Sequence, residues 1–120
     1  MAKLILVVED EFAIRDMLEM LLVEEGYRVL SAPNGQLGLE SVAQNRPDLI
    51  MADWMMPVMD GIEFCRTLQA NPDYRTIPVI FMTAVGKNIP LAEHNFLAVF
   101  DKPFDINSVL LLIEQTLGSP

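Results

Sequence analysis

The chain has 120 residues, and 52% of them are hydrophobic, which suits one compact domain and leaves little room for a second. Its formal net charge of −9 argues against binding of nucleic acid or an anionic membrane, because both attract basic surfaces, and fits a cation site or a basic protein partner. The single cysteine, Cys65, cannot form an internal disulfide, and the apolar run near the N-terminus is too short for a signal peptide or membrane span. We therefore expect a soluble domain in a reducing cytoplasm.

Apolar runs of strand length alternate with helical repeats along the chain. Gly26 is placed to end the first helix in a left-handed conformation, and Asn34 is placed to cap the second. Between residues 83 and 97, Pro90 and the lack of an amphipathic stripe predict a short or irregular fourth helix. In chain order the other predicted elements are a strand (4–8), a helix within 11–27, a strand (27–32), a helix within 34–47, a strand (48–53), a helix within 60–72, two strands (78–83 and 97–102) and a helix within 105–118.

This order of elements predicts an α/β fold. Strands that alternate with helices and are apolar throughout form parallel sheets covered on both faces. Because the crossovers must be right-handed, five strands give a doubly wound, three-layer sandwich. We expect one such domain over residues 1–120, with the strand order 2-1-3-4-5.

Polar groups stand at the ends of four of the predicted strands. In that strand order strands one, three, four and five are neighbours, and ligands of such folds bind beyond their carboxyl ends. Clustered carboxylates persist only with a counter-charge, and an oxygen-rich cluster suits Mg²⁺. A carboxylate can attack phosphorus, while a lysine and a hydroxyl hold the phosphoryl group. Each residue alone has an ordinary explanation, such as a helix cap or a solvated strand end. Together they predict a site built from Glu9, Asp10, Asp53, Thr83, Ala84 and Lys102.

Four short motifs carry a resemblance to a known family. They are "ED" (9–10), "DWMMPVMDG" (53–61), "TA" (83–84) and "KPF" (102–104). In this order, with the predicted elements between them, they resemble the receiver domains of bacterial two-component response regulators, including chemotaxis receivers. The resemblance covers the whole chain and implies a flavodoxin-like sandwich that acts as a signalling switch and not as an ordinary enzyme.

The resemblance implies a role for each residue of the site. Asp53 is the expected phosphoacceptor, which receives phosphoryl from a phosphohistidine of a sensor histidine kinase or phosphotransfer protein. Thr83 and Lys102 are expected to contact the phosphoryl group, and Ala84 to leave room for it. Relatives have a cis peptide bond after the lysine, which a proline there permits. The expected Mg²⁺ ligands are Asp10, Asp53 and the backbone carbonyl of Met55, with Glu9 assisting.

The fifth strand departs from the family pattern. Receivers usually carry Tyr or Phe three positions before the lysine, where its rotation reports phosphorylation. Here that residue is Val99, and Phe100 follows on the other face of the strand. We therefore hypothesise that switching bypasses an aromatic rotamer and acts through order in residues 85–97. The downstream target is unknown, and a monomer or weak dimer through the last helix and fifth strand is expected.

Three other functions fit the same fold class less well. A flavodoxin-like carrier of a small ligand needs backbone amides that cradle phosphate after the first strand, where this chain has the acidic residues 9–11. Aspartate-nucleophile phosphatases resemble one another in a second aspartate two positions after the nucleophile, where this chain has Met55. A receiver-like module that binds partners without phosphorylation is disfavoured by the complete acidic, threonine and lysine set. That alternative remains open to experiment.

Overall fold

The computed structural model describes residues 2–84 and 96–118. Every strand predicted from the sequence is present to within one residue at each end, and each helix predicted within those residues lies inside its expected range. The predicted irregular helix between residues 83 and 97 lies outside the described residues, except for positions 84, 96 and 97. The elements are β1 (Leu4–Val8), α1 (Phe12–Glu24), β2 (Arg28–Ala32), α2 (Gly35–Gln44), β3 (Leu49–Asp53), α3 (Gly61–Ala70), β4 (Val79–Ala84), β5 (Ala98–Lys102) and α4 (Ile106–Leu117).

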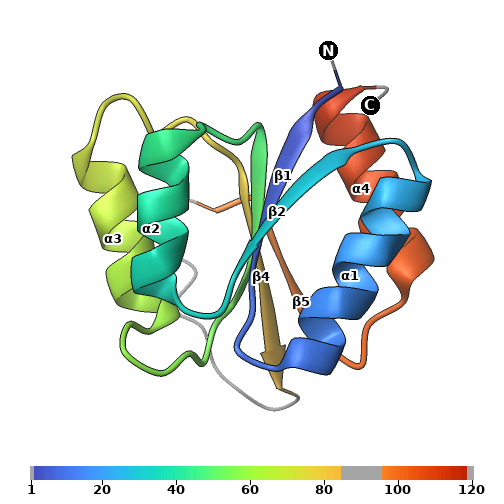
Figure 1. The fold of residues 1–120 in the computed structure, drawn as a ribbon, viewed down its shortest axis with the longest axis horizontal. Coiled ribbons are helices and arrows are strands. Elements are labelled where there is room, and N and C mark those ends of the chain that lie inside the picture. The colour runs from blue at the N-terminus through green and yellow to red at the C-terminus, as the bar shows by residue number, and fades with distance from the viewer. Residues whose placement is uncertain (1, 85–95, 119–120) are drawn as a thin grey trace.

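The five strands form one parallel sheet in the order β2-β1-β3-β4-β5 (Figure 1). The register pairs Leu6 of β1 with Ile50 of β3, and Asp53 at the end of β3 with Met82 of β4. Because all strands run the same way, their carboxyl ends lie at one edge of the sheet. This confirms the predicted doubly wound fold and strand order.

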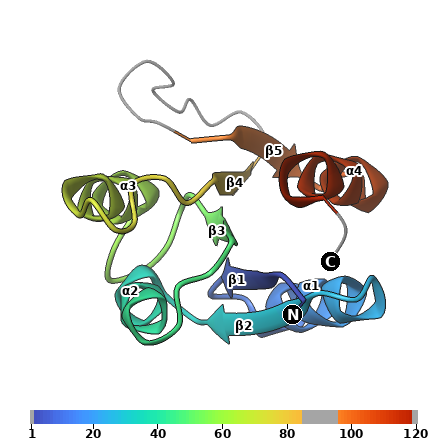
Figure 2. The same cartoon turned by 90° about the horizontal axis from the view of Figure 1, so that it is seen from above.

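Helices cover both faces of the sheet, with α2 and α3 on one side and α1 and α4 on the other (Figure 2). Side chains of the central strands β1 and β3 alternate between the two faces, and both strands are buried along their whole length. Each face therefore has its own core. Leu6, Val8, Ile50 and Ala52 pack toward α2 and α3, whereas Ile5, Val7, Leu49 and Met51 pack toward α1 and α4.

The helix ends follow local sequence signals. Gly26 has φ 102°, and the backbone amides of Gly26 and Tyr27 donate to the carbonyls of Val23 and Leu22 at 2.9 and 3.1 Å. This pair of bonds closes the end of α1 as the left-handed glycine predicts. The Asn34 side chain accepts from the backbone amide of Leu37 at 2.9 Å and caps α2. Among the residues described, no helix is long and apolar enough to cross a membrane.

Candidate phosphoacceptor site

The polar residues singled out in the sequence lie at the carboxyl edge of the sheet. Glu9 and Asp10 follow β1 directly, and Asp53 is the last residue of β3. Thr83 is one residue from the end of β4, where the register places it beside β5. Lys102 ends β5, and its peptide bond to Pro103 is cis. Because β1, β3, β4 and β5 are neighbours, residues 9 and 102 meet across a sequence separation of 93 positions.

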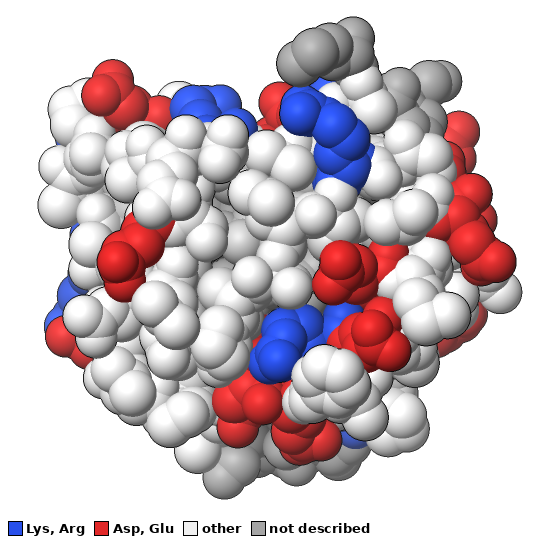
Figure 3. Space-filling model, in the orientation of Figure 1, with Lys and Arg blue, Asp and Glu red and all other residues white. Residues whose placement is uncertain are grey.

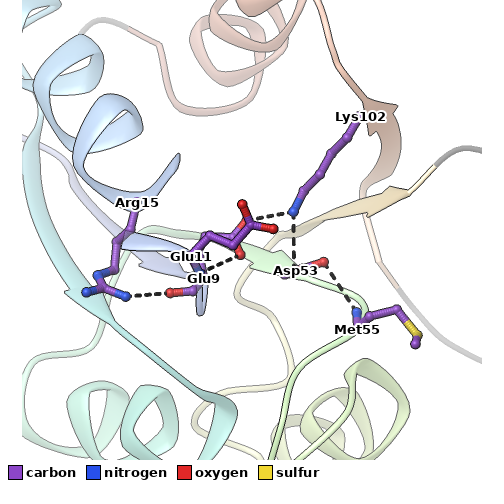
Figure 4. A network of polar contacts seen from close by, with 6 residues as sticks. All are labelled: Glu9, Glu11, Arg15, Asp53, Met55 and Lys102. Atoms are coloured by element: carbon purple, nitrogen blue, oxygen red, sulfur yellow. Dashed lines mark hydrogen bonds and ion pairs between the residues drawn. The ribbon is translucent and has the colours of Figure 1, made fainter. Parts of the chain in front are cut away.

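Lys102 stands between two carboxylates (Figure 4). Its Nζ lies 2.7 Å from Oε1 of Glu9 and 3.3 Å from Oδ2 of Asp53. The Glu9 side chain is fully buried, and Asp53 is only 6% exposed. Two buried carboxylates repel each other unless a positive charge separates them. Lys102 supplies that charge, so the lysine and both acids form one electrostatic unit.

Burial sets the protonation of this unit. Burial raises the pKa of Glu9 to about 7; the hydrogen bond from Lys102 lowers it, whereas contact with Asp10 and the charge of Asp53 raise it. Burial alone would lower the pKa of Lys102, but the hydrogen bond and charge of Glu9 and the charge of Asp53 raise it. The lysine therefore stays protonated, and Glu9 holds its proton more strongly than an exposed glutamate does.

Glu9, Asp10 and Asp53 together form a set of oxygen donors. One carboxylate oxygen from each residue lies within 4.8 Å of the other two. Asp10 is exposed, while the other two are buried, so the set opens to solvent on one side. Hard divalent cations prefer such oxygen ligands, and Mg²⁺ commonly combines one or two carboxylates with water. The donor chemistry therefore fits the metal expected from the sequence.

Backbone contacts hold both acids in place. The amide of Met55 donates to Oδ1 of Asp53 at 3.3 Å, and Nη1 of Arg15 donates to the backbone carbonyl of Glu9 at 2.8 Å (Figure 4). The side chain of Met55 is 55% exposed and points away from Asp53. Farther along this loop, Val58 has φ 72° and lies between the carbonyl of Pro57 and the amide of Met59, which are hydrogen-bonded at 2.8 Å. The result is a tight γ-turn in the loop after β3, a strained conformation for a β-branched residue.

The remaining site residues lie on β4 and β5. Thr83 is 1% exposed, and Ala84 follows it as the last residue of β4. Val99 packs with the core on the α2–α3 face, whereas Phe100 packs on the other face, with its ring 6.5 Å from that of Phe104. Val99 therefore occupies the position before Lys102 where the family usually has an aromatic ring. The hypothesised change of order in residues 85–97 falls almost entirely outside the described residues.

Two features of the site, the burial of Trp54 and a contact of Lys102, were not predicted from the sequence. Trp54, next to Asp53, is 7% exposed, and its ring packs edge-on against Phe81 at 5.0 Å. Residues 50, 52 and 54 share one face of β3 and its extension, so strand alternation was the signal that places this ring in the core. The strand order predicted that Lys102 would lie near the acids, but it did not predict the ion pair with Glu9. Which carboxylate a lysine contacts depends on side-chain rotamers and not on the strand order.

A family model described as the response regulator receiver domain matches residues 5–114. The chain belongs to this family. Sporulation initiation phosphotransferase F from Bacillus subtilis is 38% identical over 116 residues, which cover 94% of the chain and 92% of that relative. Other relatives are longer. The phosphate regulon transcriptional regulatory protein PhoB of Pseudomonas aeruginosa is 41% identical over 85 residues, which cover 71% of the chain and only 37% of that relative.

Solved structures show the same receiver fold. The receiver domain of a signal transduction histidine kinase from Syntrophus aciditrophicus is 34% identical, with a TM-score of 0.88 over 97% of this chain and 90% of that one. The receiver domain of the sensor histidine kinase PA1611 from Pseudomonas aeruginosa is 27% identical, with a TM-score of 0.88 over 99% and 100%. That structure has a magnesium ion coordinated in its active-site cleft.

Proposed function

We propose that this receiver domain is a phosphorylation-dependent switch in which Asp53 accepts a phosphoryl group. The observation that carries the proposal is the position of Asp53 at a strand end, 3.3 Å from Lys102 and within 4.8 Å of the acids that follow β1. A structural aspartate needs only a partner for its charge. A carboxylate next to a lysine, a buried threonine and two more acids has the groups that phosphoryl transfer requires.

The donor in this proposal is a phosphohistidine of a sensor histidine kinase or phosphotransfer protein. An Asp53 oxygen attacks phosphorus, and a P–O bond forms as the P–N bond to the donor imidazole breaks. The imidazole leaves with the bonding electron pair and takes up a proton. Lys102 holds the negative charge of the transferred group, and the Thr83 hydroxyl donates a hydrogen bond to it. The acyl phosphate on Asp53 then changes which partner the domain binds.

Asp10, Asp53 and the backbone carbonyl of Met55 would hold Mg²⁺ in this site, with Glu9 assisting. The support is the donor set formed by the three carboxylates and the exposure of Asp10 on its open side. When bound, the metal offsets negative charge on the phosphoryl oxygens. Glu9 is the weakest of these ligands, because its Oε1 already accepts from Lys102 at 2.7 Å.

The test is incubation with acetyl phosphate and Mg²⁺, followed by intact mass measurement. The wild-type chain is expected to gain one phosphoryl adduct that disappears when EDTA replaces Mg²⁺. Asp53→Asn keeps the shape of the side chain and should gain none. Asp101→Asn is the matched control, because Asp101 is an exposed acid next to Lys102 and should leave the adduct unchanged.

Two results would contradict the proposal. An adduct that persists in Asp53→Asn would place the chemistry on another residue. A wild-type chain that gains no adduct in the presence of Mg²⁺ would favour the alternative of a receiver-like module that binds partners without phosphorylation.

A further inference from the structure

A short loop, residues 9–11, joins β1 to α1 and carries two acids of the candidate site. β1 ends at Val8, and α1 begins at Phe12. Each of the other described helices begins with an Asn or Asp side chain that accepts a hydrogen bond from a backbone amide. Glu11, in the same position before α1, makes no such bond. The usual side-chain cap therefore does not hold the backbone at the entry to α1.

Arg15 contacts this loop from the start of α1 (Figure 4). Its Nη1 donates to the backbone carbonyl of Glu9 at 2.8 Å, and its guanidinium carbon lies 5.5 Å from the centre of the Phe12 ring. On the other side, the amide of Glu9 donates to the carbonyl of Ala32 in β2 at 3.0 Å. The backbone at Glu9 is therefore held by the sheet through its amide and by the arginine through its carbonyl.

The carbonyl that Arg15 contacts belongs to the peptide unit that joins Glu9 to Asp10. Because a peptide unit is planar, a hydrogen bond to its oxygen also fixes the direction in which the chain enters Asp10. The Asp10 carboxylate is exposed. Apart from a contact with Glu9, the Asp10 side chain makes no hydrogen bond within residues 2–84 and 96–118. The position of this carboxylate therefore depends on the backbone that carries it.

Arg15 contacts a carbonyl although the chain is rich in acids. The chain has 17 acidic residues against 8 lysines and arginines, and acidic side chains lie close to basic ones on the face seen in Figure 3. Within the part of the chain that the structure describes, Arg15 nevertheless forms no ion pair. Its charge lies beside the backbone of a proposed Mg²⁺ ligand, where it repels a cation. A benefit of Arg15 to metal binding must therefore come from geometry and not from charge.

We propose that Arg15 is a positioning residue for the Mg²⁺ site. Its hydrogen bond to the carbonyl of Glu9 holds the loop so that an oxygen of Asp10 stays within 4.8 Å of one of Asp53. Groups that orient metal ligands commonly contribute about tenfold or more to metal affinity. Arg15 itself touches neither the metal nor the phosphoryl group. The inference rests on the Mg²⁺ site of the proposed function, but not on phosphoryl transfer to Asp53.

Mg²⁺ titration of the full chain, followed by nuclear magnetic resonance, tests the proposal. Arg15→Met keeps an unbranched apolar side chain but removes the hydrogen-bond donor and the charge. This variant should bind Mg²⁺ about tenfold more weakly than wild type. Loss of charge alone has the opposite effect, because removing a positive charge near a cation site strengthens binding. Equal or tighter binding by Arg15→Met would overturn the inference.

Arg28→Met is the matched control. Arg28 also donates to a backbone carbonyl, that of Ala2 at 2.9 Å, but it lies at the start of β2, at the opposite edge of the sheet. Its removal should leave Mg²⁺ affinity unchanged or slightly higher. Thermal unfolding in EDTA checks that both variants are folded. An equal loss of affinity in Arg28→Met would show that any lost contact of this kind loosens the site, which contradicts a specific role for Arg15.

Arg15→Lys tests whether the hydrogen bond itself sets the affinity, because lysine keeps the charge and can still donate. The carbonyl-carbon signal of Glu9 in the metal-free chain reports whether the hydrogen bond is present. Mg²⁺ affinity should follow this signal across wild type, Arg15→Lys and Arg15→Met. A lysine variant that restores the signal without the affinity, or the affinity without the signal, would refute the proposed role.

Failure of this inference can be told apart from failure of the proposed function. If wild type and Arg15→Met bind Mg²⁺ equally well and both gain the phosphoryl adduct, only the role of Arg15 is refuted. A wild-type chain that binds no Mg²⁺ refutes the metal site and the role of Arg15 together.

Discussion

At the residue scale, Lys102 is the group on which the site depends. It contacts Glu9 at 2.7 Å and Asp53 at 3.3 Å, and without it two buried carboxylates would face each other uncompensated. The closer contact goes to Glu9, the residue whose pKa burial raises. The longer contact of Lys102, to Asp53, lies where the proposed phosphoryl group would arrive. We expect the shorter contact, to Glu9, to hold the lysine in place when that group binds.

The raised pKa of Glu9 predicts a pH dependence of stability. Because the folded chain binds this proton up to about pH 7, while an unfolded glutamate loses it near 4.5, the folded state holds more protons between these values. The contribution of Glu9 to the free energy of unfolding should therefore fall as the pH rises from about 4.5 to 7. In EDTA, urea unfolding of Glu9→Gln should lack this contribution, whereas the exposed control Glu11→Gln should retain it. Equal pH slopes for Glu9→Gln and wild type would contradict the assignment.

Cys65 should be chemically inert in the folded chain. The thiol is 1% exposed on α3, and burial raises its pKa above the ordinary value. Because the thiolate is the reactive form, iodoacetamide at pH 8 should label the native chain far more slowly than the chain unfolded in urea. The measurement is intact mass against time. Native labelling as fast as in urea would show that α3 does not pack as described.

At the scale of elements, the start of α3 packs tightly against the loop that follows β3. A Cβ added at Gly61 would lie 2.4 Å from Cε3 of Trp54, and the amide of Gly61 donates to the carbonyl of Trp54 at 2.9 Å. The indole is itself held against Phe81. Glycine at this position therefore lets the loop that follows Asp53 close onto the helix.

Gly61→Ala should lower the free energy of unfolding by about 1–3 kcal/mol, because the added methyl group overpacks a buried ring. Gly35→Ala is the comparison, since its Cβ would lie 3.1 Å from the flexible Met59 and should have a smaller effect. Urea unfolding followed by circular dichroism measures both. A Gly61→Ala chain as stable as wild type would contradict the packing described.

Strand and helix periods, together with turn residues such as Gly26 and Asn34, were enough to predict the elements and the sheet order, because these signals are local and the crossover rule is general. The same order predicted which strand ends would meet, and hence the neighbourhood of Asp53 and Lys102. Side-chain pairing was not predictable, because it depends on rotamers and burial. The Lys102–Glu9 contact belongs to this class, whereas the burial of Trp54 follows from strand alternation along β3 and its extension.

At the scale of the whole molecule, the fold gathers acids from distant parts of the chain at one edge of the sheet. At the carboxyl edge, Glu9 and Asp53 share a lysine and, with Asp10, provide oxygen donors. This set suits a metal ion and a phosphoryl group. A net charge of −9 favours approach of cations to this edge.

The most direct test locates the residue that carries the phosphoryl group, which we expect to be Asp53. Borohydride reduces an acyl phosphate to an alcohol, which converts a phosphorylated aspartate into homoserine. After treatment with acetyl phosphate and Mg²⁺, reduction and digestion, tandem mass spectrometry locates the converted residue. Homoserine is expected at position 53 and at no other aspartate. Conversion at Asp10 instead, or reduction of Glu9, would contradict it.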